Sequence, residues 1–126
     1  MNKPSNKLIL IIDDSQDNLD LLKLLLESKG YLVNCATNGL EALVLLNQLT
    51  RLPDIILLDM QMPGMGGYDF LTIKKTLDHL KNIPVLIMTG EENINVQIEQ
   101  SNPCGILLKP LDIKTLVNEI SKYIEL

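Results

Sequence analysis

The chain has 126 residues, of which 46% are hydrophobic and 21% charged, a size and composition that fit one globular domain with a single core. Its formal net charge of -5 is the wrong sign for neutralising nucleic-acid phosphates or anionic lipid, so direct binding to DNA or to a membrane is not expected. No apolar run approaches the roughly 20 residues of a bilayer span, and a cytoplasmic protein is expected. Cys35 and Cys104 are too few for a disulfide framework, which predicts free thiols.

The pattern of apolar residues predicts an α/β fold. Short apolar runs alternate with longer amphipathic stretches five times, as in a parallel sheet that helices cover on both faces. Strands are predicted at residues 7–12, 31–36, 55–58, 83–88 and 105–108. Helices are predicted at residues 15–29, from the cap Asn38 to about residue 49, from residue 68 to about residue 80, and from the cap Asp112 to residue 124.

A further helix is predicted within residues 91–101, where the apolar pattern is weakest. Only Ile94 and Ile98 make a helical pair there, among many Asn and β-branched residues, so we expect this helix to be marginal and mobile. The sequence shows no linker, repeat or low-complexity tract. We therefore expect one domain over residues 1–126, with a core from about residue 7 to residue 124 and frayed residues 1–6.

Polar residues follow four of the five predicted strands, and ligands of open parallel sheets bind outside these strand ends. The residues that follow these strands are Asp13 and Asp14, Asp59, Thr89 with Gly90, and Lys109. Each alone has an ordinary structural reading, such as a helix cap or a turn. Three carboxylates brought together repel one another and need either raised pKa values or a cation. The group therefore predicts a site for Mg²⁺, or Mn²⁺, beside a phosphate.

The residues separate three kinds of chemistry. Hydrolysis by metal-activated water usually needs histidine ligands, and the only histidine, His79, lies far from the strand ends. Nucleotide binding needs a phosphate-cradling glycine loop, and the sequence GMGGYD at Gly64 matches neither common form. Phosphoryl transfer onto a carboxylate fits best, with Asp59 as the candidate acceptor and without turnover as an enzyme.

Four motifs at the strand ends carry a family resemblance: IDD at residues 12–14, LLDMQMPGMGG at 57–67, MTG at 88–90 and LKP at 108–110. With them the chain resembles the receiver domain of two-component response regulators, of the single-domain, chemotaxis-regulator kind, over nearly its whole length. The resemblance implies a flavodoxin-like, doubly wound sheet of five parallel strands in the order 2-1-3-4-5, with five helices. In that order Cys35 and Cys104 lie on opposite edges, too far apart for a disulfide.

The resemblance also implies roles for single residues. Asp59 would take a phosphoryl group from a phosphohistidine on a sensor histidine kinase or phosphotransfer protein. Lys109, Thr89 and Gly90 would hold the phosphoryl oxygens. The Mg²⁺ ligands would be Asp14, Asp59 and the backbone carbonyl of Gln61, with Asp13 acting through metal-bound water. Three more positions follow from the family: a cis proline at Pro110, and dephosphorylation tuning at Gln61 and Glu91.

Phosphorylation in the family switches a protein-binding face made of the fourth helix, the fifth strand and the fifth helix. An aromatic residue usually takes part in the switch with Thr89, and here Ile106 occupies its position. Alternatives remain open: an interaction scaffold of the same fold that is never phosphorylated, a receiver module cut from a hybrid histidine kinase, or a metal-dependent phosphatase. The start at Met1 and the last helix favour a complete chain, and the Met-Gln after Asp59 argues against the phosphatase.

Overall fold

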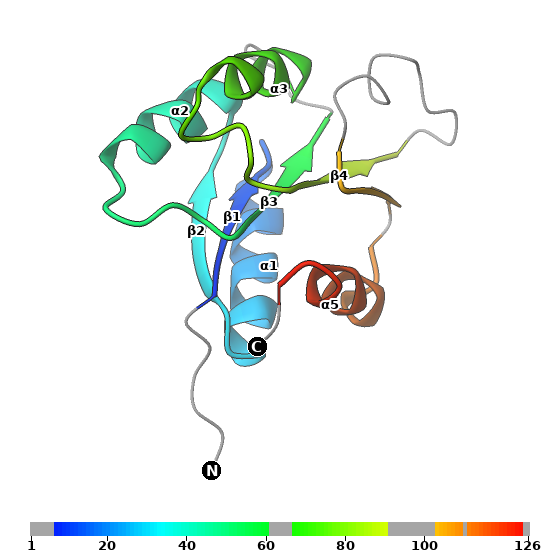
Figure 1. Cartoon of the computed structure of the whole chain (residues 1–126). Coiled ribbons are helices and arrows are strands. Elements are labelled where there is room, and N and C mark those ends of the chain that lie inside the picture. Colours follow the sequence, from blue (N-terminus) through cyan, green and yellow to red (C-terminus); the bar gives the residue numbers. More distant parts are fainter. Residues whose placement is uncertain (1–6, 61–66, 91–102, 110, 125–126) are drawn as a thin grey trace.

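Five parallel strands form one twisted sheet in the order β2-β1-β3-β4-β5 (Figure 1). This computed structural model describes residues 7–60, 67–90, 103–109 and 111–124. The strands are β1 (Leu8–Ile12), β2 (Leu32–Ala36), β3 (Ile55–Asp59), β4 (Val85–Thr89) and β5 (Gly105–Leu108). The predicted fold class and strand order are therefore confirmed, with strand limits within two residues of those predicted.

Helices cover both faces of the sheet. The described helices are α1 (Gln16–Ser28), α2 (Gly39–Gln48), α3 (Gly67–Thr76) and α5 (Ile113–Ser121). Figure 1 shows α2 and α3 on one face and α1 and α5 on the other. The helix predicted within residues 91–101 lies outside the described residues. Among the described helices, none is long and apolar enough to cross a membrane.

The core has two halves, one on each face of the sheet. Side chains of successive strand residues point to opposite faces, so Ile9 and Ile11 of β1 pack with α1 and α5, whereas Leu10 and Ile12 pack with α2 and α3. All four are fully buried. The continuous apolar strands follow from this, because a parallel sheet with helices on both faces has no solvent side.

Polar side chains cap the helices, as the sequence indicates for two of them. The side-chain Oδ1 of Asn38 accepts the N–H of Glu41 at 2.8 Å, and Oδ1 of Asp112 accepts the N–H of Lys114 at 2.8 Å. At α1 the cap is Ser15, whose hydroxyl accepts the N–H of Asn18 at 3.3 Å. Neither Asp13 nor Asp14 is therefore the N-cap of α1.

The third helix is one turn shorter than predicted. It ends at Thr76, and the chain continues in tight turns in which the N–H of Leu80 bonds to the carbonyl of Leu77 at 2.9 Å. Leu80 is still fully buried, because the turn delivers it to the core. The helical spacing of Leu77 and Leu80 therefore predicts a longer α3 than the structure shows. Thr76 also donates its hydroxyl to the Ile73 carbonyl, a bond that is common where helices end.

Two glycines meet backbone requirements. Gly30 ends α1 with a φ of 99°, as predicted for the residue after that helix. Gly67 starts α3 so close to the end of β3 that an added Cβ would lie 2.5 Å from Sδ and 3.1 Å from Cα of Met60. Both cysteines are free thiols, as predicted, with Cys35 on β2 and Cys104 just before β5 at the other edge.

Candidate functional site

The carboxyl ends of four strands bring the predicted polar residues to one edge of the sheet. Asp13 follows β1, Asp59 ends β3, Thr89 ends β4 and Lys109 follows β5. Backbone bonds extend the pairing beyond the strands: the N–H of Met60 donates to the Met88 carbonyl, and the N–H of Lys109 donates to the Thr89 carbonyl at 2.8 Å. The backbone, which is stiff here, therefore sets the spacing of these side chains.

Three carboxylates form a cluster at this edge. One oxygen each of Asp13, Asp14 and Asp59 lie within 4.8 Å of one another. Asp13 and Asp59 are buried, whereas Asp14 is exposed. The cluster is thus closed on the protein side and open toward solvent through Asp14.

Asp13 is the carboxyl whose environment opposes its charge. Burial raises the pKa of Asp13, and the negative charge of Asp59 raises this pKa further. The N–H of Ser15 donates to Oδ1 of Asp13 at 3.0 Å and lowers the pKa in part, as does the positive charge of Lys109. Repulsion inside the cluster is therefore only partly compensated by the protein.

Lys109 supplies the cation that faces the cluster. Its Nζ lies 3.0 Å from Oδ2 of Asp59, whose side chain is only 2% exposed. The lysine side chain itself keeps 27% of its surface, so the ion pair has one buried and one accessible partner. An incoming anion could reach the ammonium from solvent without displacing the backbone.

Three of the remaining predicted residues, Thr89, Gly90 and Ile106, lie within the described part of the chain. Thr89 is buried at the end of β4, and Gly90 after it is exposed. Ile106 lies opposite Ile87 on β5, half-buried against the part of the core under α2 and α3, and so stands apart from the carboxylates. Gln61, Glu91 and Pro110 lie outside the described residues.

A cavity of about 510 Å³ adjoins the cluster. It is lined by Asp13 and Lys109 on the polar side and by residues of α1, β4 and the stretch after β5: Asn18, Leu21, Leu22, Met88 and Leu111. The sequence predicts no role for Leu21, Leu22 or Leu111. Leu21 is one of several leucines in α1, and its exposure of 55% is not evident from the sequence.

The donor set fits a small divalent cation. Carboxylate oxygens are the ligands that Mg²⁺ prefers, and opposite ligands of one such ion stand about 4.2 Å apart at its usual bond lengths of about 2.1 Å. The 4.8 Å span of the three carboxylates is close to that size. A cation would also relieve the repulsion that raises the pKa of Asp13.

Comparisons with known proteins agree on one family. A family model described as the response regulator receiver domain matches residues 9–121. Sporulation initiation phosphotransferase F of Bacillus subtilis is 37% identical over 124 residues, 96% of this chain and 96% of that protein. Sensor histidine kinase CheAY of Helicobacter pylori is 31% identical over 127 residues, 99% of this chain and 16% of that protein. The solved structure of chemotaxis response regulator CheY4 of Vibrio cholerae superposes with a TM-score of 0.86 at 26% identity, covering 95% of this chain and 100% of that one.

The family match includes all four strand-end motifs and the whole described sheet except Leu8, the first residue of β1. The resemblance noted from the motifs is therefore confirmed by comparison of the complete sequence and of the fold. The chain belongs to the response regulator receiver domain family and is a receiver of two-component signal transduction.

Proposed function

We propose that Asp59 is the phosphoryl acceptor of this receiver, and that the donor is the phosphohistidine of a sensor histidine kinase or phosphotransfer protein. The observation that carries the proposal is the ion pair of Lys109 with Asp59, at 3.0 Å, beside two further carboxylates. A nucleophilic carboxylate, a cation for the transferred oxygens and a set of metal ligands are the parts that such a transfer needs.

In the proposed step, a carboxylate oxygen of Asp59 forms a bond to phosphorus as the bond from phosphorus to the donor nitrogen breaks. The electron pair stays on the imidazole nitrogen, which takes a proton from solvent. Lys109 turns from the carboxylate to an oxygen of the transferred group, while the hydroxyl of Thr89 and the N–H of Gly90 donate to others. Thr89 is already at the strand end, so its motion is a side-chain rotation.

The proposed metal ligands are Asp14, Asp59 and the backbone carbonyl of Gln61, with Asp13 bonded to metal-bound water. When bound, Mg²⁺ supplies positive charge that neutralises the phosphoryl oxygens as they approach the carboxylates. Asp13 is oriented for this by the N–H of Ser15, which holds Oδ1 at 3.0 Å. Gln61 and Glu91 are further proposed to set how fast the acyl phosphate hydrolyses.

Two surfaces are proposed for partners. The donor would approach over the cavity next to Asp13, where the exposed Leu21 offers an apolar contact beside the carboxylates. The phosphorylated receiver would bind its target through a face that includes β5 and α5, switched by Thr89 and Ile106. The half-exposed Leu108 on β5 supports that choice, because it places apolar surface on this side of the molecule. The proposed site of action is the cytoplasm, where histidine kinases present their phosphohistidine.

One alternative has a specific observation in its favour. The match to CheAY covers 16% of that protein, so a sequence of this kind also occurs inside a longer histidine kinase. The receiver chemistry is the same in both settings, and the chain would then pass its signal within one polypeptide. In either case Asp59 accepts a group and releases it, and the receiver does not turn over an external substrate.

The proposal is tested by incubating the protein with Mg²⁺ and either acetyl phosphate or beryllofluoride. We expect a mass increase of one phosphoryl group, and a fluorine NMR signal for the bound fluoride, in the wild type and in the control variant Asp69→Asn, which changes an exposed carboxyl on α3. Neither signal should occur in Asp59→Asn. Equal modification of Asp59→Asn would place the acceptor elsewhere, and no modification of the wild type would favour the scaffold that is never phosphorylated.

A further inference from the structure

A second cavity, of about 420 Å³, lies near the amino ends of β4 and β5, whereas the carboxylates lie at the carboxyl ends of the strands. It opens where β4 begins, between the end of α3 and the residues that lead into β5. Three lysines line it: Lys74, Lys75 and Lys81. The lining also includes the apolar residues Leu71 and Val85, although most of the surface that faces the cavity is polar. The protein carries a net charge of -5, so a group of three cations around one cavity runs against its overall charge.

Lys74 is the unusual member of this group. Its side chain is on the buried side of α3, and only 6% of the residue is exposed. Lysine is almost never buried to this degree without a partner, because removing an ammonium from water is unfavourable. Burial accordingly lowers the pKa of the Lys74 ammonium.

The protein satisfies only part of the bonding capacity of Lys74. Its Nζ donates to the backbone carbonyl of Lys81 at 3.3 Å. An ammonium has three donors, and over residues 7–60, 67–90, 103–109 and 111–124 no carboxylate lies within ion-pair distance of this Nζ. Lys74 is thus a buried ammonium in the cavity lining, with one backbone acceptor and no ion pair among the described residues.

The other groups at the cavity do not provide the missing negative charge. Burial raises the pKa of the Cys104 thiol to about 11, so this thiol is neutral at physiological pH. Asp78 lies 3.3 Å from Nζ of Lys81, but its side chain is 95% exposed and points to solvent. Lys81 thus remains a cation at the rim with a weak, screened partner.

We propose that this cavity binds a small anionic molecule, with a carboxylate or phosphate head on the lysines and an apolar body against Leu71 and Val85. The volume lies within the usual range for small-molecule sites, about 300–1,000 Å³. The anion would accept hydrogen bonds from the Lys74 ammonium and stabilise its charged form. Lys75 and Lys81 would add long-range attraction.

Phenyl phosphate and benzoate are suitable probes, since each joins an anionic head to an apolar ring, and inorganic phosphate lacks the ring. The full chain is titrated without divalent metal while amide and lysine side-chain NMR signals are recorded. We expect saturable shifts at residues 71–85 and 103–105 with at least one of the ring-bearing probes, and weaker binding of inorganic phosphate. The stronger of phenyl phosphate and benzoate identifies phosphate or carboxylate as the head.

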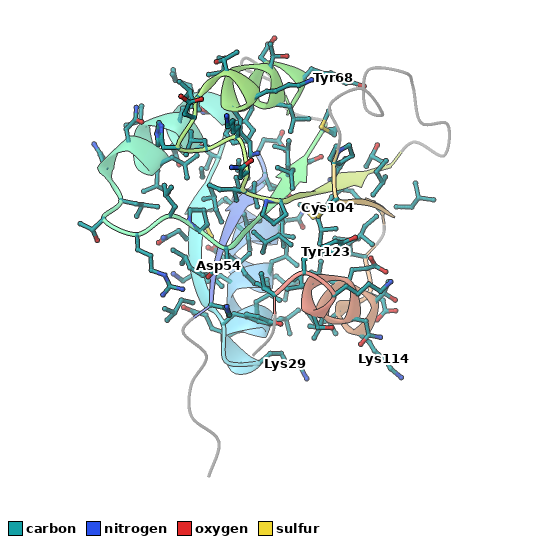
Figure 2. All side chains as sticks on the ribbon, in the orientation of Figure 1. Lys29, Asp54, Tyr68, Cys104, Lys114 and Tyr123 are labelled. Atoms are coloured by element: carbon teal, nitrogen blue, oxygen red, sulfur yellow. The ribbon has the colours of Figure 1, made fainter. Side chains whose placement is uncertain are left out.

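Lys74→Met keeps the apolar stem and removes the charge, so it should weaken binding at least tenfold. Lys114→Met is the control, an exposed lysine on α5 that Figure 2 shows well away from Cys104, and it should bind like the wild type. The double variant Lys75→Gln, Lys81→Gln leaves the buried position intact and should weaken binding by a smaller factor, which covers the case that Lys74→Met does not fold. Three results would overturn the proposal. They are NMR shifts at Asp59 and none at the cavity, equal affinity of Lys74→Met and the wild type for the probes, and no saturation with any probe. Because Asp59 phosphorylation is measured separately, either proposal can fail without the other.

Discussion

Lys109 and Asp59 form an ion pair in which the acid is almost completely buried and the lysine reaches it from solvent, with Nζ and Oδ2 3.0 Å apart. They come from the ends of β5 and β3, and β4 lies between these two strands. The long side chain of Lys109 spans that intervening strand. The pair therefore links Asp59, the proposed phosphoryl acceptor, to the strand of the proposed target-binding face.

Substituting Lys109→Met should slow phosphorylation of Asp59 by acetyl phosphate at least about tenfold, because the cation that faces the transferred oxygens is lost. It should also lower the free energy of unfolding without metal by about 1–3 kcal/mol, since the buried carboxylate of Asp59 loses its ion pair with Lys109. Rates follow from mass spectrometry and stability from urea denaturation. Lys114→Met serves as the control, and an unchanged rate in Lys109→Met would remove Lys109 from the transfer step.

Adding Mg²⁺ should stabilise the folded protein. A ligand that binds only the folded state at about 100 times its dissociation constant adds about 2.7 kcal/mol, which for a chain of this size raises the melting temperature by several degrees. Calorimetric scans with Mg²⁺ and with a chelator measure the difference. Asp14→Asn should reduce it, whereas Asp69→Asn should leave it intact. Identical melting temperatures with and without metal would argue against the three-carboxylate site.

Replacing Asp13→Asn should stabilise the metal-free protein, because the amide keeps an oxygen for the N–H of Ser15 and loses the charge that Asp59 repels. The stability that Asp13→Asn gains over the wild type depends on pH. The pKa of Asp13 is raised above 3.8 in the folded state, so the folded wild type binds this proton more tightly than the unfolded chain, and its stability rises as the pH falls through the folded pKa.

The advantage of Asp13→Asn should therefore be largest at neutral pH and shrink as the pH falls toward 3.8. Urea denaturation of both proteins across this range, without divalent metal, measures it. Subtracting the two curves removes the other titrating groups, including Asp112, whose pKa is lowered by its bonds as a helix cap. A difference that grows on acidification would contradict the raised pKa.

Gly67→Ala should lower the free energy of unfolding by about 1–3 kcal/mol, even though alanine is the better helix former. The new Cβ would lie 2.5 Å from the sulfur and 3.1 Å from Cα of Met60, so α3 must move away from the end of β3. In a double-mutant cycle, Met60→Ala should recover part of the loss, because it removes the sulfur and leaves the backbone contact. Additive effects of the two substitutions would show that they do not touch.

The positions of Asp13, Asp59, Thr89 and Lys109 could be predicted from the sequence because a parallel sheet brings all carboxyl strand ends to one edge. A residue that directly follows a strand must then lie at this edge of the sheet, near the residues that follow the neighbouring strands. The end of α3 could not be predicted, since Leu77 and Leu80 keep helical spacing although the chain between them turns. Apolar periodicity records burial, and a turn can bury a side chain as well as a helix can.

The burial of Lys74 could not be predicted from the sequence either. Charged residues are normally solvated, so a lysine within an amphipathic helix is assigned to the outer face by its chemistry. Its burial depends on how α3 sits over the start of β4, which the sequence pattern alone does not give. The role of Ser15 was also missed, because two aspartates before it were equally good candidates for the helix cap.

Strand β3 has a hydrogen-bonded neighbour on each side and is buried along its whole length, so Asp59 is attached to the part of the backbone that should exchange its amide protons most slowly. Strand β3 should therefore move little when Asp59 takes the proposed phosphoryl group. The rearrangement should be taken up at β5, which is an edge strand, and a change at Asp59 would reach it through the pairing of β3 with β4 and of β4 with β5.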